Sequence, residues 1–302
     1  MNTGGTPQRG IRNAFTVDVE DYFQVAALAS AIDRASWPLR EPRVERNTGV
    51  LLDMLAESGV RGTFFVLGWI AERHPALIRR IAAAGHEIAC HGFSHQLIYT
   101  QTPDEFREET ARSKRILEDL AGAPVIGYRA ASFSITRRSL WALDVLIDLG
   151  FSYDSSIFPI RHDLYGIAGA DPRPAPLSAP SGRSLVEFPM SAAAFLGVQV
   201  PVSGGGYFRL LPYAVTRAGL RQINGRFGRP FTFYLHPWEI DPGQPRIPVG
   251  WLSRFRHYNN LHRCESRLRR LLQEFRFGTM REVLQGLSLL PGTALRTPGT
   301  PP

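Results

Sequence analysis

Segments rich in β-branched and aromatic residues alternate with amphipathic segments along most of the chain. Residues 13–20 (NAFTVDVE) predict a strand that ends in carboxylates, and residues 60–68 (VRGTFFVLG) predict a buried strand. Between them, residues 43–59 predict a helix whose apolar residues share one side, namely Val44, Leu51, Leu52 and Leu55. Strands that alternate with helices in this way are typical of a parallel sheet.

The alternation continues to about residue 160. Residues 102–122 give the clearest helix, with Thr102 as N-cap, Pro103 in the first turn and Glu105 completing a capping box. Further helices are predicted at 69–85 and 136–150, and further strands at 86–90, 124–129 and 151–154. The sequence therefore predicts an α/β fold with a parallel sheet, either an open doubly wound layer or a barrel.

The pattern is looser in the second half of the chain. The Pro-rich residues 171–181 predict a loop, and GGGYF (204–208) predicts a mobile loop because no Gly-Lys-Ser/Thr follows it. Strands are predicted at 184–190 and 230–238, with a helix at 212–224 between them. A last amphipathic helix presents an apolar face formed by Leu261, Leu268, Leu271, Leu272 and Phe275.

Composition excludes several classes of protein. The formal net charge is +8 over 302 residues, but the basic residues, of which only Lys114 is not arginine, are spread along the chain without a nucleic-acid-binding signature. Cys90 and Cys264 are too few for a disulfide framework. Neither an apolar N-terminal signal region nor an apolar run of about 18 residues is present. We therefore expect a cytoplasmic protein without a transmembrane segment.

Polar residues gather at the predicted strand ends. In a parallel βα fold, the carboxyl ends of the strands meet at one end of the sheet and build the site there. The side chains expected at this end are Asp18, Glu20 and Asp21 after the first strand, His91 and His95 after the third, Arg129 after the fourth, Asp154 after the fifth and His236 after the last.

These side chains suit metal-assisted hydrolysis. His91 and His95 stand four residues apart, one helical turn, so both rings could leave one face. Two imidazoles and one carboxylate are the protein ligands of a catalytic zinc site with an open position. A second carboxylate could accept a proton from the attacking water, and a further histidine could protonate a leaving amine. Water attack with loss of an amine is amide hydrolysis.

The segments TVDVED, HGFSH, YRAASF, YDSSIFP and FYLHPWE, in this order, resemble the five motifs of the polysaccharide deacetylases of the NodB-homology type, carbohydrate esterase family four. The wider run from residue 13 to 285, including GGYFRLLPY and RFRHYNNL, is similar to the exosortase- and exopolysaccharide-associated subfamily with a C-terminal extension. The expected organisation is a flexible N-terminus (1–12), a NodB-homology barrel (13–240), an extension packed on the barrel (241–285) and a disordered tail (286–302).

The resemblance implies a distorted (β/α)7-type barrel with a C-terminal helical extension. It also implies a divalent metal, usually Zn2+, and removal of N-acetyl groups from amino sugars of an exopolysaccharide or its precursor. Association with membrane-bound polysaccharide-synthesis machinery is a further expectation. By motif, Asp18 matches the general base, His91 and His95 the metal ligands, Arg129 the arginine that holds the base, His236 the catalytic histidine and Asp154 the acid that supports it.

Two positions depart from the family pattern. Val19 stands where the family has the aspartate that binds the metal. Glu20 points to the same side of a strand as Asp18 and is the expected substitute, with Asp21 as the alternative. Ala131 stands where the third motif normally has proline, which affects the expected geometry of that loop.

Three other functions remain open from the sequence. The first is a hydrolase of small cyclic amides or imides on the same fold. The second is a catalytically silent glycan-binding protein that keeps the barrel groove. The third is a non-haem iron oxygenase, because two histidines and one carboxylate also describe its metal site, although that function leaves His236 and Asp154 without a role.

Overall fold

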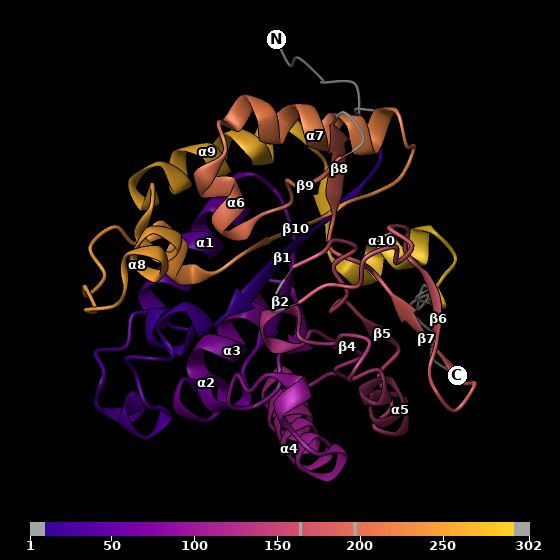
Figure 1. Cartoon of the computed structure of the whole chain (residues 1–302), viewed down its shortest axis with the longest axis horizontal. Coiled ribbons are helices and arrows are strands. Elements are labelled where there is room, and N and C mark those ends of the chain that lie inside the picture. Colours follow the sequence, from indigo (N-terminus) through magenta and orange to yellow (C-terminus); the bar gives the residue numbers. More distant parts are fainter. Residues whose placement is uncertain (1–9, 163–164, 196–197, 293–302) are drawn as a thin grey trace, which may run out of the picture.

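The computed structural model describes residues 10–162, 165–195 and 198–292. Its main sheet is curled into a distorted barrel, with the strands in the order β10-β1-β2-β3-β4-β5-β7-β6 (Figure 1). The strands from β10 to β7 run parallel, as the sequence predicts. They are β1 (Asn13–Val19), β2 (Thr63–Val66), β3 (Glu87–Cys90), β4 (Gly127–Tyr128), β5 (Tyr153–Asp154), β7 (Ser184–Glu187) and β10 (Thr232–Leu235).

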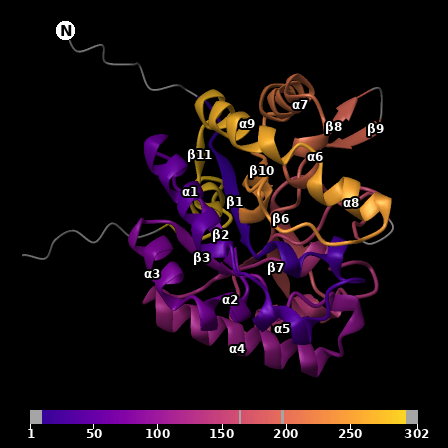
Figure 2. The same cartoon turned by 90° about the vertical axis from the view of Figure 1, so that its left-hand side faces the viewer.

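Helices surround this sheet on its outer side (Figures 1 and 2). The capping box predicted at Thr102 is confirmed, since its hydroxyl accepts from the amide of Glu105 while the Glu105 carboxylate accepts from the amide of Thr102. The helices are α1 (Val44–Glu57), α2 (Gly68–Arg73), α3 (Pro75–Ala83), α4 (Pro103–Ala121), α5 (Trp141–Asp148), α6 (Gly205–Leu210), α7 (Tyr213–Gly225), α8 (Trp251–Tyr258), α9 (Leu261–Glu274) and α10 (Met280–Gly286).

Several expected elements differ from those in the structure. The single helix predicted at 69–85 is two helices that meet at His74, because Pro75 can begin a helix but lacks the amide that would continue one. The loop predicted at 171–181 contains β6 (Ala175–Ser178), which pairs antiparallel with β7 at the sheet edge. Two further short pairings were not predicted, the hairpin of β8 (Ala192–Phe195) and β9 (Val198–Pro201) and the strand β11 (Phe277–Gly278) beside β1.

The predicted mobile loop at GGGYF is also wrong, because Gly204 lies against β10 and α6 begins at Gly205. Backbone and side chains outside the named strands also bond to β10. Tyr234 donates its amide to the Ser203 carbonyl (2.9 Å), and the hydroxyl of Ser191 accepts from the amide of Thr232 (3.1 Å). A Cβ on Gly204 (φ +137°) would lie 1.9 Å from the Tyr234 carbonyl oxygen, so only glycine allows this approach.

Side-chain alternation divides the core into two parts. On β1, Phe15 and Val17 belong to the large outer core between sheet and helices, whereas Ala14 belongs to a smaller cluster with Phe65 and Met280. This smaller cluster fills one end of the barrel interior, where α10 packs against it. Flexible tails were predicted at 1–12 and 286–302, of which residues 1–9 and 293–302 lie outside the described residues. Within the described part, Leu290 is 8% exposed and belongs to the smaller cluster.

Candidate active site

Strand β1 brings Asp18 into the barrel interior. Alternate residues of a strand face the same side, so Asp18 shares the side of Ala14 and Thr16. Strand β10 pairs with β1 in the register Val17 to Leu235, and the next residues along the two strands are Asp18 and His236. Asp18 Oδ2 and His236 Nε2 consequently lie 3.9 Å apart.

Glu20, His91 and His95 form a compact buried group. One ligand atom from each lies within 4.8 Å of the others, and the three residues are at most 8% exposed. Glu20 Oε2 is 2.8 Å from His95 Nε2 but has no hydrogen-bond partner of correct geometry. The structure therefore contains a possible Glu/His metal site.

The spacing of His91 and His95 suggested one helical turn, but the two histidines do not lie on a helix. They lie in the loop after β3, in which Gly92 (φ +76°) and His95 (φ +53°) have left-handed backbone conformations. The changes of chain direction at these left-handed residues bring the His91 and His95 rings to a centroid distance of 5.5 Å. The loop, rather than a helical face, directs both imidazoles to one place.

Two members of this group, His91 and Glu20, have protonation states that suit a metal ion. His91 Nδ1 lies 2.8 Å from the Arg129 carbonyl, which can only accept, so Nδ1 carries the proton and Nε2 keeps its lone pair. Burial lowers the pKa of His91 to about 4 and keeps the ring neutral. Burial opposes ionisation of Glu20, but the charges of His95 and His236 outweigh it and lower the pKa of Glu20 to about 2.

Asp21, the alternative carboxylate, is engaged elsewhere. Its Oδ1 accepts from the amide of Tyr22 (2.8 Å), and its Oδ2 accepts from the amides of Arg43 (2.7 Å) and Val44 (2.9 Å). Asp21 therefore joins the residues after β1 to the start of α1. The geometry groups Glu20, not Asp21, with the two histidines.

Arg129 holds Asp18 at the end of β1. Its Nη1 donates to Asp18 Oδ1 (2.6 Å) and to Thr16 Oγ1 (2.8 Å), and its other nitrogens donate to the Ser155 carbonyl and hydroxyl. The guanidinium is completely buried and lies 4.0 Å from the centre of the Phe65 ring. Because all its contacts are inside the barrel, Arg129 fixes the orientation of the Asp18 carboxylate.

His236 is oriented by Glu239, which the sequence analysis missed. His236 Nδ1 lies 2.7 Å from Glu239 Oε1, while Nε2 faces Glu20 Oε1 (3.4 Å) and Asp18 Oδ2. Burial alone would lower the pKa of His236, but the charges of Glu20 and Glu239 raise it to about 9. The imidazole therefore carries a proton at neutral pH.

Behind Glu239 lies a second buried charge, Arg209 on α6. Arg209 Nε donates to Glu239 Oε2 at 2.6 Å, and the two residues are 1% and 0% exposed. The other guanidinium nitrogens donate to the backbone carbonyls of Arg256, His257 and Asn259. Arg209 thus joins Glu239 to the last turn of α8 and to the residue that follows it.

In the described part of the chain, Asp154 makes no direct contact with the His236 ring nitrogens, although the fourth motif implied that it supports this histidine. Among the described residues, the carboxylates within 4.0 Å of the His236 ring nitrogens are Asp18, Glu20 and Glu239. The register of β5 and β7 instead places Asp154 opposite Glu187, and burial raises the pKa of Asp154 to about 6.

Asp154 has a supporting contact to the loop after β4. Its Oδ1 accepts from the Ser156 hydroxyl (2.5 Å), which in turn accepts from the Ala130 amide (2.8 Å). This loop contains the left-handed residues Ser132 (φ 51°) and Phe133 (φ 54°) and the departure from the family pattern at Ala131. Asp154 therefore helps to hold the backbone next to Arg129.

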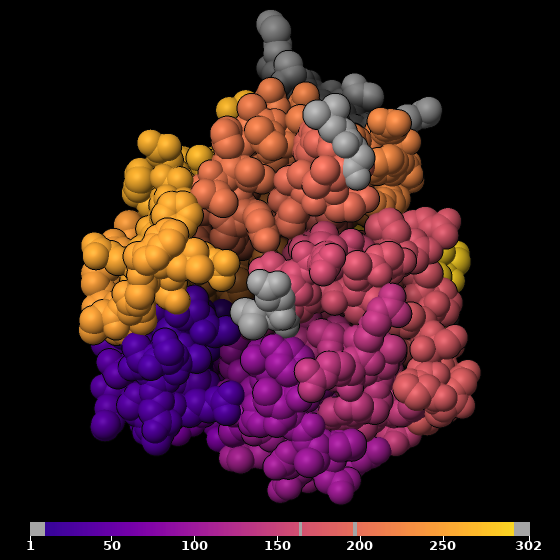
Figure 3. All heavy atoms as spheres, viewed as in Figure 1, coloured from indigo at the N-terminus to yellow at the C-terminus, as the bar shows by residue number. Residues whose placement is uncertain are grey.

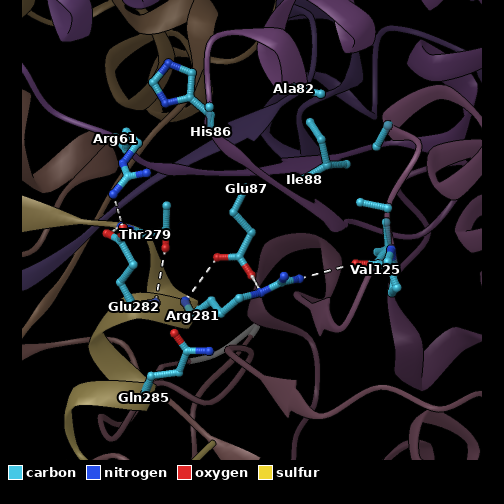
Figure 4. A pocket seen from close by; sticks show the side chains of 14 residues that line it. Arg61, Ala82, His86, Glu87, Ile88, Val125, Thr279, Arg281, Glu282 and Gln285 are labelled. Carbon is cyan, nitrogen blue, oxygen red and sulfur yellow. Dashed lines mark hydrogen bonds and ion pairs between the residues drawn. The ribbon is translucent and has the colours of Figure 1, made fainter. Parts of the chain in front are cut away.

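A separate cavity lies at the opposite end of the barrel. Its volume is about 310 Å³, and its walls come from β3, α3, α4 and α10 (Figure 4). The charged side chains in it pair with each other, Arg61 with Glu282 and Arg281 with Glu87. It contains none of the residues that the motifs select.

Comparison with protein families gives two adjacent matches. Residues 33–153 match the polysaccharide deacetylase model, and residues 155–285 match a domain of unknown function, DUF3473. Over these two ranges the chain is similar to polysaccharide deacetylases and to DUF3473 proteins, respectively. The two matches share one sheet, because β7 and β10 from the second segment pair with β5 and β1 from the first part of the chain.

Two curated relatives match parts of the chain. A peptidoglycan-N-acetylglucosamine deacetylase of Bacillus cereus is 40% identical over 75 residues, which are 25% of this chain and 27% of the relative. A chitooligosaccharide deacetylase of Rhizobium leguminosarum bv. trifolii is 31% identical over 146 residues, 48% of this chain and 60% of the relative. The chain thus spans less than two thirds of the length of these relatives.

Two solved structures share the fold over nearly the whole chain. One, described as a polysaccharide deacetylase from Mycobacterium smegmatis, has a TM-score of 0.60 at 24% identity and covers 97% of this chain and 96% of its own. The PuuE allantoinase has a TM-score of 0.63 at 18% identity, with coverage of 95% and 94%. These likenesses confirm the expected distorted (β/α) barrel.

Proposed function

We propose that this protein is a metal-dependent deacetylase that removes N-acetyl groups from amino sugars of an exopolysaccharide or its precursor. The observation that carries the proposal is the arrangement of two different proton-transfer groups around one metal-binding group. Arg129 holds Asp18, and Glu239 holds His236. His236 Nε2 lies 3.9 Å from Asp18 Oδ2 and 3.4 Å from Glu20 Oε1 of the metal-binding group. A base and an acid at one amide are what hydrolysis of that amide requires.

Glu20, His91 and His95 would hold the metal, for which Zn2+ is the best match to a carboxylate and two imidazoles. When bound, such an ion would polarise the acetyl carbonyl and lower the pKa of water. The orphaned Glu20 Oε2 and the free Nε2 of neutral His91 are the donor atoms that fit it.

The remaining residues move and hold protons. Asp18 accepts a proton from the water that attacks the acetyl carbon, and Arg129 holds the carboxylate that accepts it. As the C–N bond breaks, His236 Nε2 donates its proton to the sugar nitrogen, which leaves as an amine. Glu239 accepts from Nδ1 and keeps Nε2 directed at the reacting group.

The test is acetate release by the full chain, supplied with Zn2+, from N-acetylated chitooligosaccharides and from bacterial exopolysaccharide. We expect acetate in equal amount to the new free amines, with loss of activity on chelation and recovery on return of Zn2+. A matched reaction with a cyclic imide separates the alternative hydrolase. Hydrolysis of the imide without acetate release from any glycan would refute the proposal.

A further inference from the structure

The segment 242–264 is basic and exposed. It contains Arg246, Arg254, Arg256 and Arg263 but no aspartate or glutamate. Among the described residues these four guanidinium groups form no ion pair, whereas Arg269, farther along α9, pairs with two glutamates. The positive charge of this segment is therefore not compensated within the described chain.

Helix α8 (Trp251–Tyr258) exposes apolar side chains within this basic segment. Trp251 is 79% exposed, Leu252 43% and Phe255 47%. Their spacings of three and four residues place them on one face of the helix. The other side is anchored, since His257 is 1% exposed and stacks on Trp238 at 4.3 Å. The helix lies at the outside of the molecule (Figures 1 and 3).

We propose that α8 is a peripheral membrane-binding element that inserts Trp251, Leu252 and Phe255 among lipids while the arginines contact anionic headgroups. An amphipathic helix with aromatic and aliphatic residues on one face and basic residues beside it is suited to the membrane interface. Charge complementarity selects an anionic membrane surface. No helix among the described residues could cross a membrane, so the contact would be at the surface.

The side chains fit a membrane better than a glycan or a protein. A sugar site combines an aromatic face with carboxylates or amides that bind hydroxyl groups, and the exposed face of α8 offers Trp251, Leu252, Phe255 and arginines only. A stable protein interface needs about 800 Å² on each partner, far more than one two-turn helix presents. Lipids require no complementary shape.

Docking through α8 would hold the site close to the membrane surface. Trp238 stacks on His257 of α8 at 4.3 Å and also on His236 at 5.2 Å. Two ring contacts therefore separate the membrane element from the imidazole of the site. The docking proposal itself does not depend on the chemistry of that site.

The experiment is co-sedimentation of the full chain with vesicles of phosphatidylcholine alone and of equal parts phosphatidylcholine and phosphatidylglycerol. We expect binding to the anionic vesicles only, with weaker binding at high salt. A Trp251→Ser/Phe255→Ser variant should bind about ten-fold more weakly. Each of Arg254→Gln and Arg256→Gln should weaken binding roughly five-fold.

Phe227→Ser is the matched control. Phe227 is 39% exposed and has arginines beside it, but it lies at the end of α7. Its replacement should leave vesicle binding unchanged, and circular dichroism should show all variants folded, because every replaced side chain is on the surface. Equal binding by wild type and Trp251→Ser/Phe255→Ser would overturn the proposal. The proposal would also be overturned if the protein bound a soluble acidic polysaccharide through the same side chains but did not bind the vesicles.

Discussion

Replacement of Glu239 by glutamine tests whether a buried chain of charges holds the imidazole of His236, the proposed acid. In the structure Arg209, Glu239 and His236 follow one another at contacts of 2.6 and 2.7 Å, and Glu239 has no exposed surface. Glutamine has nearly the same shape but only one acceptor oxygen, so its NH2 group must face a donor, either His236 Nδ1 or Arg209 Nε. The change therefore removes the negative charge and one of the two hydrogen bonds.

The expected effects follow from two contacts. A hydrogen bond to a charged group contributes about 1.5–3 kcal/mol and a neutral one about 0.5–1.5 kcal/mol. Loss of about 1–2 kcal/mol of orientation at His236 corresponds to a decrease in kcat of roughly 5- to 30-fold. Arg209 also loses its counter-charge but keeps three carbonyl acceptors. We therefore expect a decrease in the free energy of unfolding at the lower end of the range for a broken buried pair, about 3 kcal/mol.

The assay is steady-state deacetylation of an N-acetylated oligosaccharide together with urea unfolding. KM should stay constant in Glu239→Gln, because Glu239 contacts His236 and Arg209 rather than the site opening. Glu239→Asp, which keeps the charge, should recover part of kcat. Asp154→Asn is the matched control, a buried carboxylate at a strand end that does not contact His236.

A full kcat in Glu239→Gln would refute this reasoning. A larger loss of kcat in Asp154→Asn than in Glu239→Gln would return the supporting role to Asp154. If Arg209→Lys and Arg209→Met lost kcat equally while Glu239→Gln kept it, Arg209 would stabilise the fold without orienting His236 through Glu239.

Three further predictions concern other carboxyl groups of the barrel. Glu20→Gln should lose most bound Zn2+ by elemental analysis, whereas Asp21→Asn should keep the metal but unfold at lower urea concentration. Asp18→Asn should retain metal while turnover falls by about 10²-fold or more; an unchanged rate would remove Asp18 from the mechanism. Burial raises the pKa of Glu187 and of Asp154, so the folded state binds protons at this pair more tightly than the unfolded state does. The contribution of the protonated pair to the free energy of unfolding is therefore lost as pH rises from about 4 through about 6. Glu187→Gln should flatten that decline in thermal unfolding temperature.

Much of the barrel could be predicted because its strands are short apolar runs with polar ends. The positions of Asp18, His91, Arg129 and His236 followed from these ends, and the structure brings all four to one end of the barrel. Pairing at the sheet edge could not be predicted in the same way. Strand β6 is Pro-rich and half exposed, so its pairing with β7 depends on long-range register rather than on local apolar pattern.

The partner of His236 could have been found from local sequence. In HPWE, proline stands at the first position of a helical turn and Glu239 at the third, the spacing of a capping box, and Glu239 Oε1 indeed accepts from the His236 amide at 3.1 Å. Arg209 had no such signal. Its pairing with Glu239 joins positions 30 residues apart, through a helix that the glycines of GGGYF concealed.

The division between the two family matches does not divide the site. The deacetylase match supplies His91, His95 and Arg129, and the preceding β1 region supplies Asp18 and Glu20. The DUF3473 match supplies the other part, with His236 and Glu239 in the turn after β10 and Arg209 on α6. Because β10 is the strand that pairs with β1 beside Asp18, the register between these two strands sets the distance from the proposed base to the proposed acid. The DUF3473 segment is therefore part of the barrel wall and of the proposed catalytic machinery.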